Sequence, residues 1–269
     1  MTRNLVATLV ACAAVALSLA GASCSRQSEQ AQAPAAAPAP PITQSIDVSQ
    51  FNEAQQADIR AIVRDYLVRD PAVLEAALEA LAAQKADERR REFENDTRSY
   101  SHGPANAAVT IVELYDYRCP YCHAALEWVN RVIATRRDVR VVFREHPILT
   151  QQSHEAALAA MAVLQQNRQR FLPFHRALMA FRGDLTSAQI DTLARNAGVD
   201  VARMRRDMGN PEIEEQFRRT MELASESGMT GTPAFVINGR VVNGYPGPEE
   251  LDRVLREATE AARTQQTSN

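Results

Sequence analysis

Residues 108–122 read Ala-Val-Thr-Ile-Val-Glu-Leu-Tyr-Asp-Tyr-Arg-Cys-Pro-Tyr-Cys, and this stretch decides the fold. The first eight of these residues (108–115) are almost continuously apolar and rich in β-branched side chains, which predicts a buried strand. Cys119 and Cys122 follow at once, and the apolar residues after them recur at helical spacing. The stretch therefore predicts a strand that leads directly into a helix, with a C-x-x-C pair at the start of that helix.

A C-x-x-C pair in the first turn of a helix has a specific chemical consequence. The unpaired N–H groups and the dipole at that end stabilise an anion, so the first thiol ionises easily. Pro120 suits this turn because proline has no N–H to leave unpaired. Thiol pKa values in such motifs fall from ~8.5 to roughly 3.5–7. We expect an exposed Cys119 that attacks a substrate disulfide, and Cys122, one turn on, that resolves the mixed disulfide.

The same cysteine pair has two other interpretations. Half of a zinc or copper site would need a second ligand pair, but no other C-x-x-C is present and the five histidines are scattered. His123 adjoins Cys122, so a copper- or metal-binding envelope protein that uses the same thiols stays open as the alternative function. An inert structural disulfide is less favoured, because a ring of two intervening residues constrains little chain. No dedicated metal site is expected.

Glu113 lies six residues before Cys119, on the predicted strand that leads into the motif. A carboxylate buried beneath a dithiol would have a raised pKa and could take up the proton of the second cysteine. Two alternatives stay open. Glu113 could face solvent, or Asp116, which lies nearer to the motif, could serve in its place.

Composition narrows the remaining possibilities. The chain has 269 residues, of which 45% are hydrophobic and 23% charged, and this is typical of a globular protein. The length favours one substantial domain with appendages. The formal net charge is −3, so no basic surplus is present to neutralise phosphates, and nucleic acid is not expected as a partner.

The N-terminus reads as an export leader. Residues 1–22 combine a basic start at Arg3 with a short apolar run and terminal small residues, which predicts a signal peptide. Cys24, two residues after it, is also typical of a lipoprotein, although Gly21 replaces the usual Leu-like residue, so both cleavage and lipidation at Cys24 stay open. Residues 23–45 are an Ala/Pro-rich linker. In either case we expect a periplasmic protein, free or anchored to the membrane by lipid.

Residues 46–98 predict a helical stalk, because apolar residues recur there at helical spacing and Asp70-Pro71 restarts the pattern as an N-cap and first helical residue. The narrow stripe of apolar side chains needs another protein surface to bury it. Either the stalk forms a hairpin packed on the main domain, or it is an oligomerisation segment through which copies of the chain associate.

Residues 99–269 predict the order β-α-β, a helix-rich block over about 150–227, and then β-β-α. Pro233 follows Thr232 at the start of the last pair of strands, a position that suits a residue without an N–H.

The Cys-Pro-Tyr-Cys motif at a strand-to-helix junction, the helical block, and Thr-Pro-Ala-Phe-Val-Ile-Asn-Gly at residues 232–239 together resemble the DsbA family over roughly residues 99–265. The resemblance implies an α/β fold: a thioredoxin fold with a helical insertion, here preceded by the helical stalk. It makes Cys119 the nucleophile, Cys122 the resolving cysteine and Glu113 the buried acid. It also implies a cis bond before Pro233, which would let the Thr232 backbone pair with a substrate strand. The residues expected to bind substrate are Pro120, Tyr121, Thr232 and Pro233.

Two positions depart from the oxidase type of this family, namely Tyr121 within the motif and Thr232 before the proline. They are closer to DsbG and to the group of the suppressor-of-copper-sensitivity protein C and Com1-like surface proteins. The stalk resembles the N-terminal segment of that group, which in some members makes oligomers such as trimers.

The resemblance thus implies a periplasmic thiol–disulfide oxidoreductase that forms or reshuffles disulfides in exported proteins, with isomerase favoured over oxidase. No cofactor is expected beyond the Cys119–Cys122 disulfide, and the expected partners are exported protein substrates and a membrane redox partner that recharges or reduces the enzyme.

Overall fold

The computed structural model describes residues 48–267. The predicted signal peptide, the predicted linker and Cys24 lie outside this range. The described chain forms a five-stranded sheet in the order β1-β3-β2-β4-β5. Its strands are β1 (Tyr100–His102), β2 (Val109–Tyr115), β3 (Val139–Glu145), β4 (Ala234–Ile237) and β5 (Arg240–Asn243). The β2–β3 pair is parallel and the other pairs are antiparallel.

From β2 onward, helices fill the intervals between the strands in the predicted order, with a block of helices between β3 and β4, whereas β1 is a strand that the sequence pattern did not predict. After a short 3-10 turn, Val48–Gln50, the helices are α1 (Glu53–Arg69), α2 (Pro71–Asn95), α3 (Pro120–Thr135), α4 (Gln151–Gln166), α5 (Arg168–Ala180), α6 (Ser187–Asn196), α7 (Val201–Asp207), α8 (Pro211–Glu226) and α9 (Pro248–Thr267). Within residues 48–267, no helix combines the length and the apolarity that a membrane crossing requires.

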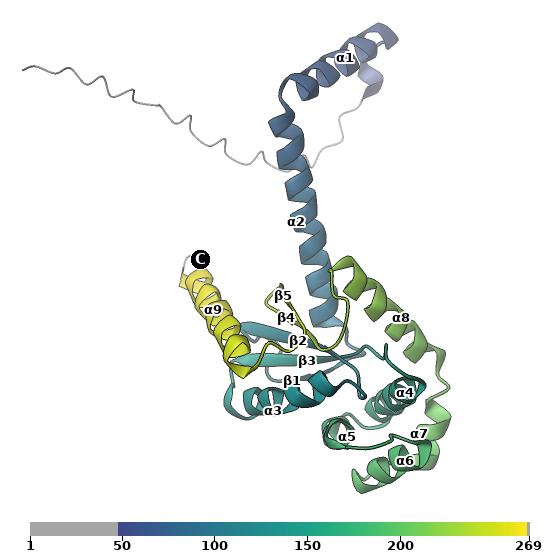
Figure 1. Cartoon of the computed structure of the whole chain (residues 1–269). Coiled ribbons are helices and arrows are strands. Elements are labelled where there is room, and N and C mark those ends of the chain that lie inside the picture. The colour runs from purple at the N-terminus through teal and green to yellow at the C-terminus, as the bar shows by residue number, and fades with distance from the viewer. Residues whose placement is uncertain (1–47, 268–269) are drawn as a thin grey trace, which may run out of the picture. The chain divides into compact units, whose positions relative to one another are not determined.

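Strand β2 is buried along its whole length because both faces of the sheet are covered. Side chains alternate between the faces of a strand. Ile111 and Tyr115 therefore join a core with α3, α5 and α9, while Val112 and Leu114 join a second core with α2 and α8. Figure 1 shows α3 and the end of α2 on opposite sides of the sheet. This double cover explains the near-continuous apolarity of residues 108–115.

The C-terminal end of α2 is attached to the sheet by one aromatic ring and one buried ion pair. Phe93 lies in the second core and is almost fully buried. The guanidinium of Arg144, buried on β3, lies over the Phe93 ring and donates a 2.7 Å hydrogen bond to Asp96. The same guanidinium group is 3.2 Å from the Ser99 hydroxyl. These contacts fix where the stalk helix ends and the domain begins.

In the remainder of α2 the large apolar side chains are exposed to solvent. Leu78 is 57% exposed, and Leu74 and Leu81 on the same helical face are exposed as well. The alternative of a stalk hairpin packed on the main domain is therefore wrong for this stripe. Asp70 occupies the N-cap position of α2, as predicted, but its side chain makes no capping hydrogen bond.

We expect Phe93→Ala to lower the free energy of unfolding by about 3–5 kcal/mol, because it removes a buried ring and leaves a cavity between α2 and the sheet. Urea unfolding followed by circular dichroism measures this change. Met221→Ala on α8 is the matched control, since Met221 is 48% exposed and its truncation should change stability by less than about 0.5 kcal/mol. Equal effects of the two substitutions would contradict the attachment described above.

Candidate active site

Cys119 is the residue that precedes α3, and Pro120 is the first residue of that helix. The Cys119 N–H donates to the Asp116 carbonyl at 3.1 Å, and the Cys119 carbonyl accepts from the His123 N–H at 3.1 Å. These bonds form because a tight turn must join the end of β2 to the start of α3. The structure thus places both cysteines, as free thiols, in the first turn of a helix.

The expectation that Cys119 is exposed is wrong, since only 4% of the residue is accessible. The loop before β4 covers it, and the Cys119 Sγ donates to the Thr232 carbonyl at 3.1 Å. The peptide bond between Thr232 and Pro233 is cis. On the outer side of the thiol, Pro120 and Tyr121 are open to solvent, and Tyr121 is 65% exposed. A substrate must therefore reach Cys119 between the exposed pair Pro120 and Tyr121 and the Thr232 backbone.

The two thiols differ sharply in their acidity. A hydrogen bond from the Cys122 thiol is the largest of the interactions that lower the pKa of Cys119, to about 5, and the N–H groups of Cys122 and Tyr121 add to it. The Thr232 side chain, next to the thiol, lowers the pKa of Cys119 further. Burial raises the pKa of Cys122 above its ordinary value, and the neighbouring Cys119 thiolate raises it further. At neutral pH the pair therefore holds one thiolate, on Cys119, and the hydrogen bond from Sγ to the Thr232 carbonyl belongs to the protonated form of that thiol.

We expect the alkylation rate of the reduced protein by iodoacetamide to rise with pH through a midpoint near 5 and to level off by about pH 7. The sign follows from the depressed pKa of Cys119, which leaves the thiolate as the main form above that midpoint. Cys119→Ser should alkylate only slowly, because Cys122 is buried and its raised pKa keeps it protonated. A midpoint near that of a free cysteine, at about pH 8.5, would overturn this assignment.

Glu113 is buried on β2, so the alternative that it faces solvent is wrong. Burial raises the pKa of Glu113 to about 8. A charge on Glu113 also raises the pKa of Cys122. A carboxyl group that titrates near neutrality close to a buried thiol can accept the thiol's proton when Cys122 becomes a nucleophile.

Because the folded-state pKa of Glu113 is raised, its neutral form stabilises the fold at low pH, and this stability is lost as the pH rises through about 8. We therefore expect Glu113→Gln to leave the free energy of unfolding nearly unchanged at pH 5 and to increase it by a few kcal/mol at pH 9. Urea unfolding of the reduced protein at both pH values measures the difference. An equal effect at the two pH values would show that Glu113 is not forced to ionise in the core.

Asp116 does not take the place of Glu113. Its side chain is buried and accepts hydrogen bonds from three backbone N–H groups, those of Arg118 at 2.7 Å, Ile148 at 2.9 Å and Leu149 at 3.0 Å. With its oxygens occupied, Asp116 positions the active-site loop against the loop that follows β3. The sequence pattern did not reveal this role.

The sequence pattern also did not reveal a buried polar network next to the active-site turn. The Tyr115 hydroxyl donates to Glu145 at 2.6 Å, and the Tyr117 hydroxyl lies 3.1 Å from Nδ1 of His175. Burial raises the pKa of Glu145 to about 7 and lowers the pKa of His175 to about 3. The network links β2, β3 and α5 next to the active-site turn. The ring pairs Tyr115–Tyr117 and Tyr115–His175 pack edge to face within it.

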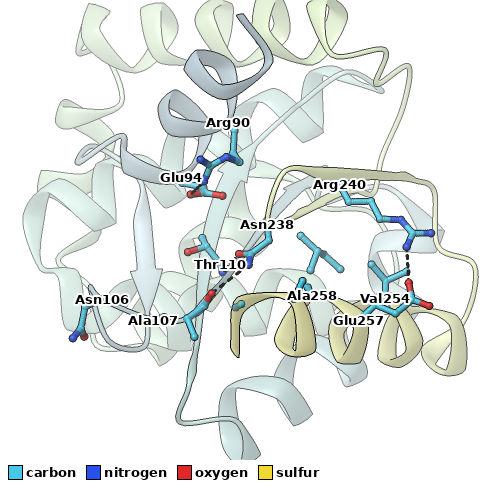
Figure 2. Close-up of a pocket in the computed structure, with 14 residues that line it drawn as sticks. Arg90, Glu94, Asn106, Ala107, Thr110, Asn238, Arg240, Val254, Glu257 and Ala258 are labelled. Atoms are coloured by element: carbon cyan, nitrogen blue, oxygen red, sulfur yellow. Dashed lines mark hydrogen bonds and ion pairs between the residues drawn. The ribbon is translucent and has the colours of Figure 1, made fainter. Parts of the chain in front are cut away.

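A cavity of about 790 Å³ lies away from the thiols. Figure 2 shows it between α2, the β4–β5 turn and α9, with Thr110 at the opposite end of β2 from the cysteines. Its polar groups are largely paired with one another: Asn238 accepts from the Thr110 N–H at 2.9 Å, and Arg240 pairs with Glu257 at 2.8 Å. This cavity is not part of the thiol site.

No cluster of three or more His, Cys, Asp and Glu side chains suited to hold a metal ion occurs among the described residues. At the motif itself the available ligands are the two sulfurs of Cys119 and Cys122.

Comparison with known families gives two matches. Residues 110–256 match the model of the DSBA-like thioredoxin domain. Residues 55–88 match the N-terminal domain of the copper resistance protein ScsC. These matches confirm the prediction of an α/β thioredoxin fold with a helical insertion and preceding helices, and they confirm the resemblance stated from the motifs.

Similar solved structures agree. A thioredoxin-like oxidoreductase from Silicibacter pomeroyi is 35% identical with a TM-score of 0.60, over 64% of this chain and 98% of that one. ScsC from Proteus mirabilis in a transitional conformation is 27% identical with a TM-score of 0.60, over 79% and 99%. A periplasmic thioredoxin-like protein from Salmonella enterica serovar Typhimurium is 26% identical with a TM-score of 0.59, over 64% and 96%.

Among curated relatives, the Na(+)/H(+) antiporter NhaA 3 of Salinispora tropica is 28% identical over 166 residues, which is 62% of this chain but 26% of the antiporter. The chain thus spans about a quarter of the length of the first of these relatives. The probable disulfide bond formation protein D of Bacillus anthracis is 25% identical over 154 residues, 53% of this chain and 71% of that protein.

Proposed function

This chain belongs to the family of DsbA-like thioredoxin-domain proteins, and from that premise we propose that it is a periplasmic thiol–disulfide oxidoreductase acting on exported proteins. One observation carries the proposal. The Cys119 sulfur lies at the start of α3, 3.1 Å from the Thr232 carbonyl, with its pKa lowered to about 5 above a buried partner thiol. Such a pair exchanges disulfides without any cofactor beyond itself.

The exchange proceeds in two steps. The Cys119 thiolate attacks one sulfur of a substrate disulfide, the substrate S–S bond breaks, and the departing sulfur leaves as a thiolate that takes up a proton. In the molecules in which Glu113 is ionised, Cys122 then loses its proton to that carboxylate and attacks the Cys119 sulfur. The mixed disulfide breaks, the pair is oxidised, and the substrate sulfur leaves as a thiolate that takes up a proton. In isomerisation a second substrate thiolate attacks the mixed disulfide instead, so Cys119 leaves as a thiolate and no electrons are transferred overall.

Substrate binding in this scheme uses the backbone next to Cys119. When a mixed disulfide forms, the Cys119 thiol no longer donates to the Thr232 carbonyl, and that oxygen is free to accept an N–H from a substrate strand beside Pro233. Three exposed apolar side chains at and near the thiol site suit an unfolded chain, namely Tyr121, Ile148 and Leu149.

We favour isomerase over oxidase. An isomerase needs a nucleophile that stays ionised, and it works best when several active sites face one misfolded substrate. The exposed leucines of α2 are a surface through which copies of the chain could associate, as a trimer in our proposal. A membrane redox partner would then keep the pair reduced, whereas for an oxidase it would recharge the disulfide.

Two assays test whether the protein is an isomerase or an oxidase: reactivation of scrambled ribonuclease in a glutathione buffer, and oxidation of reduced ribonuclease. Light scattering gives the mass of the protein in solution and so its oligomeric state. Leu74→Glu with Leu78→Glu should lower the mass and the isomerase rate several-fold but leave oxidation unchanged. Ala76→Glu with Ala83→Glu, on the opposite face of α2, is the matched control. Turnover that survives Cys119→Ser would refute the mechanism. Isomerase activity that survives in a monomeric leucine variant would refute the role of the stalk.

A copper-binding envelope protein is the second candidate, favoured by the match of residues 55–88 to a domain named for copper resistance. Two thiolates one helical turn apart are ligands of the soft type that Cu(I) prefers. This candidate predicts tight, stoichiometric Cu(I) binding by the wild type, loss of binding in Cys119→Ser, and negligible disulfide exchange in the ribonuclease assays.

A further inference from the structure

A groove of about 550 Å³ begins beside the nucleophile and is separate from the Thr232 side of the thiol. Arg118, Pro120 and His123 line it from the active-site turn. Phe181 and Arg182 line it from the segment that follows α5. Because Arg118 and Pro120 are the chain neighbours of Cys119, the groove starts about one residue, ~3.8 Å, from the reacting position.

The groove carries an excess of positive charge. Arg182 donates to the carbonyls of Met179 at 2.8 Å and Phe181 at 3.2 Å, and in the described part of the chain it forms no ion pair with a carboxylate. Arg118 donates to the Gly183 carbonyl and lies 3.9 Å from Asp184, a carboxylate whose side chain is 83% exposed. Two guanidinium groups therefore face the groove against one solvated carboxylate.

The hydrogen bonds of the two arginines also fix their position. Bonds to main-chain carbonyls orient both guanidinium groups without neutralising their charge. The bond from Arg118 to Gly183 holds the segment after α5 against the active-site turn. A guanidinium held in place with N–H groups to spare is well suited to receive a carboxylate, while Phe181 and Pro120 offer apolar contact to the methylenes of its side chain.

We infer that this groove selects substrates with an acidic residue next to the target cysteine, and that Arg182 is the residue that recognises the carboxylate. The inference rests on the proposed function, since it concerns the substrate of the same exchange reaction. The carboxylate takes no part in bond making or breaking. It pairs with the groove, holds the neighbouring cysteine sulfur near the Cys119 thiolate, and so raises the rate of mixed-disulfide formation.

Three disulfide-linked peptides that differ only in the residue after the target cysteine, Glu, Gln or Lys, test the inference. Stopped-flow measurement of their reaction with the reduced full-length protein should give the order Glu, Gln, Lys, with Glu about two- to fivefold faster than Gln. The preference should shrink in 0.5 M salt because screening weakens a solvent-exposed pair.

Arg182→Gln should bring the ratio of the Glu to the Gln rate close to one. Arg195→Gln, an exposed arginine at the end of α6 that does not line the groove, should keep the wild-type ratio. Equal rates for the three peptides in the wild type, or a ratio that persists in Arg182→Gln, would overturn the inference. Bis(2-hydroxyethyl) disulfide, which is neutral, distinguishes failure of this inference from failure of the proposed function. If only the inference fails, the protein still reacts with this disulfide; if the proposed function fails, it does not.

Discussion

The 3.1 Å contact between the Cys119 sulfur and the Thr232 carbonyl, a hydrogen bond while the thiol is protonated, is the contact on which the rest of the site depends. It joins residues 113 positions apart, and it forms because β2 and β4 are neighbours in the sheet and deliver their adjoining loops to one end. The bond closes the site from one side while the solvent-exposed Pro120 and Tyr121 leave it open from the other. The Cys119 sulfur is therefore buried in the dithiol, and the side of Pro120 and Tyr121 is the side from which a substrate can approach it.

Burial beneath that contact creates the chemical asymmetry of the pair. Both cysteines belong to one helical turn, yet Cys119 receives hydrogen bonds that favour the thiolate, whereas Cys122 lies in the core, where a charge is costly. The same burial raises the pKa of Glu113 to about 8. A core made only of apolar side chains would be more stable, so the ionisable groups under the thiols are understood best as a cost that the chemistry requires.

The helices outside the sheet serve the site in different ways. Helix α5 reaches the active-site turn through the Tyr117–His175 pair and ends at the segment that lines the charged groove. Helix α2 is attached to the other face through Phe93 and Arg144 and carries its leucines into solvent. The insertion thus shapes what approaches Cys119, and the stalk offers a surface for other copies of the chain.

The sequence by itself determined the strand-to-helix junction at 108–122, the order of strands and helices from β2 to α9, and the helix start at Cys119, because strand and helix periodicity and C-x-x-C spacing are local properties of the chain. It also singled out Glu113, but it left open whether that carboxyl was buried. It did not reveal the short strand β1. Only the tertiary structure decided that Cys119 is covered and that backbone N–H groups donate to the Asp116 carboxylate. It also decided that Glu145 and His175 pair with Tyr115 and Tyr117. The physical reason is distance along the chain: the contacts of Glu145, His175 and Thr232 join residues 30, 58 and 113 positions apart, and no local pattern encodes which of them meet.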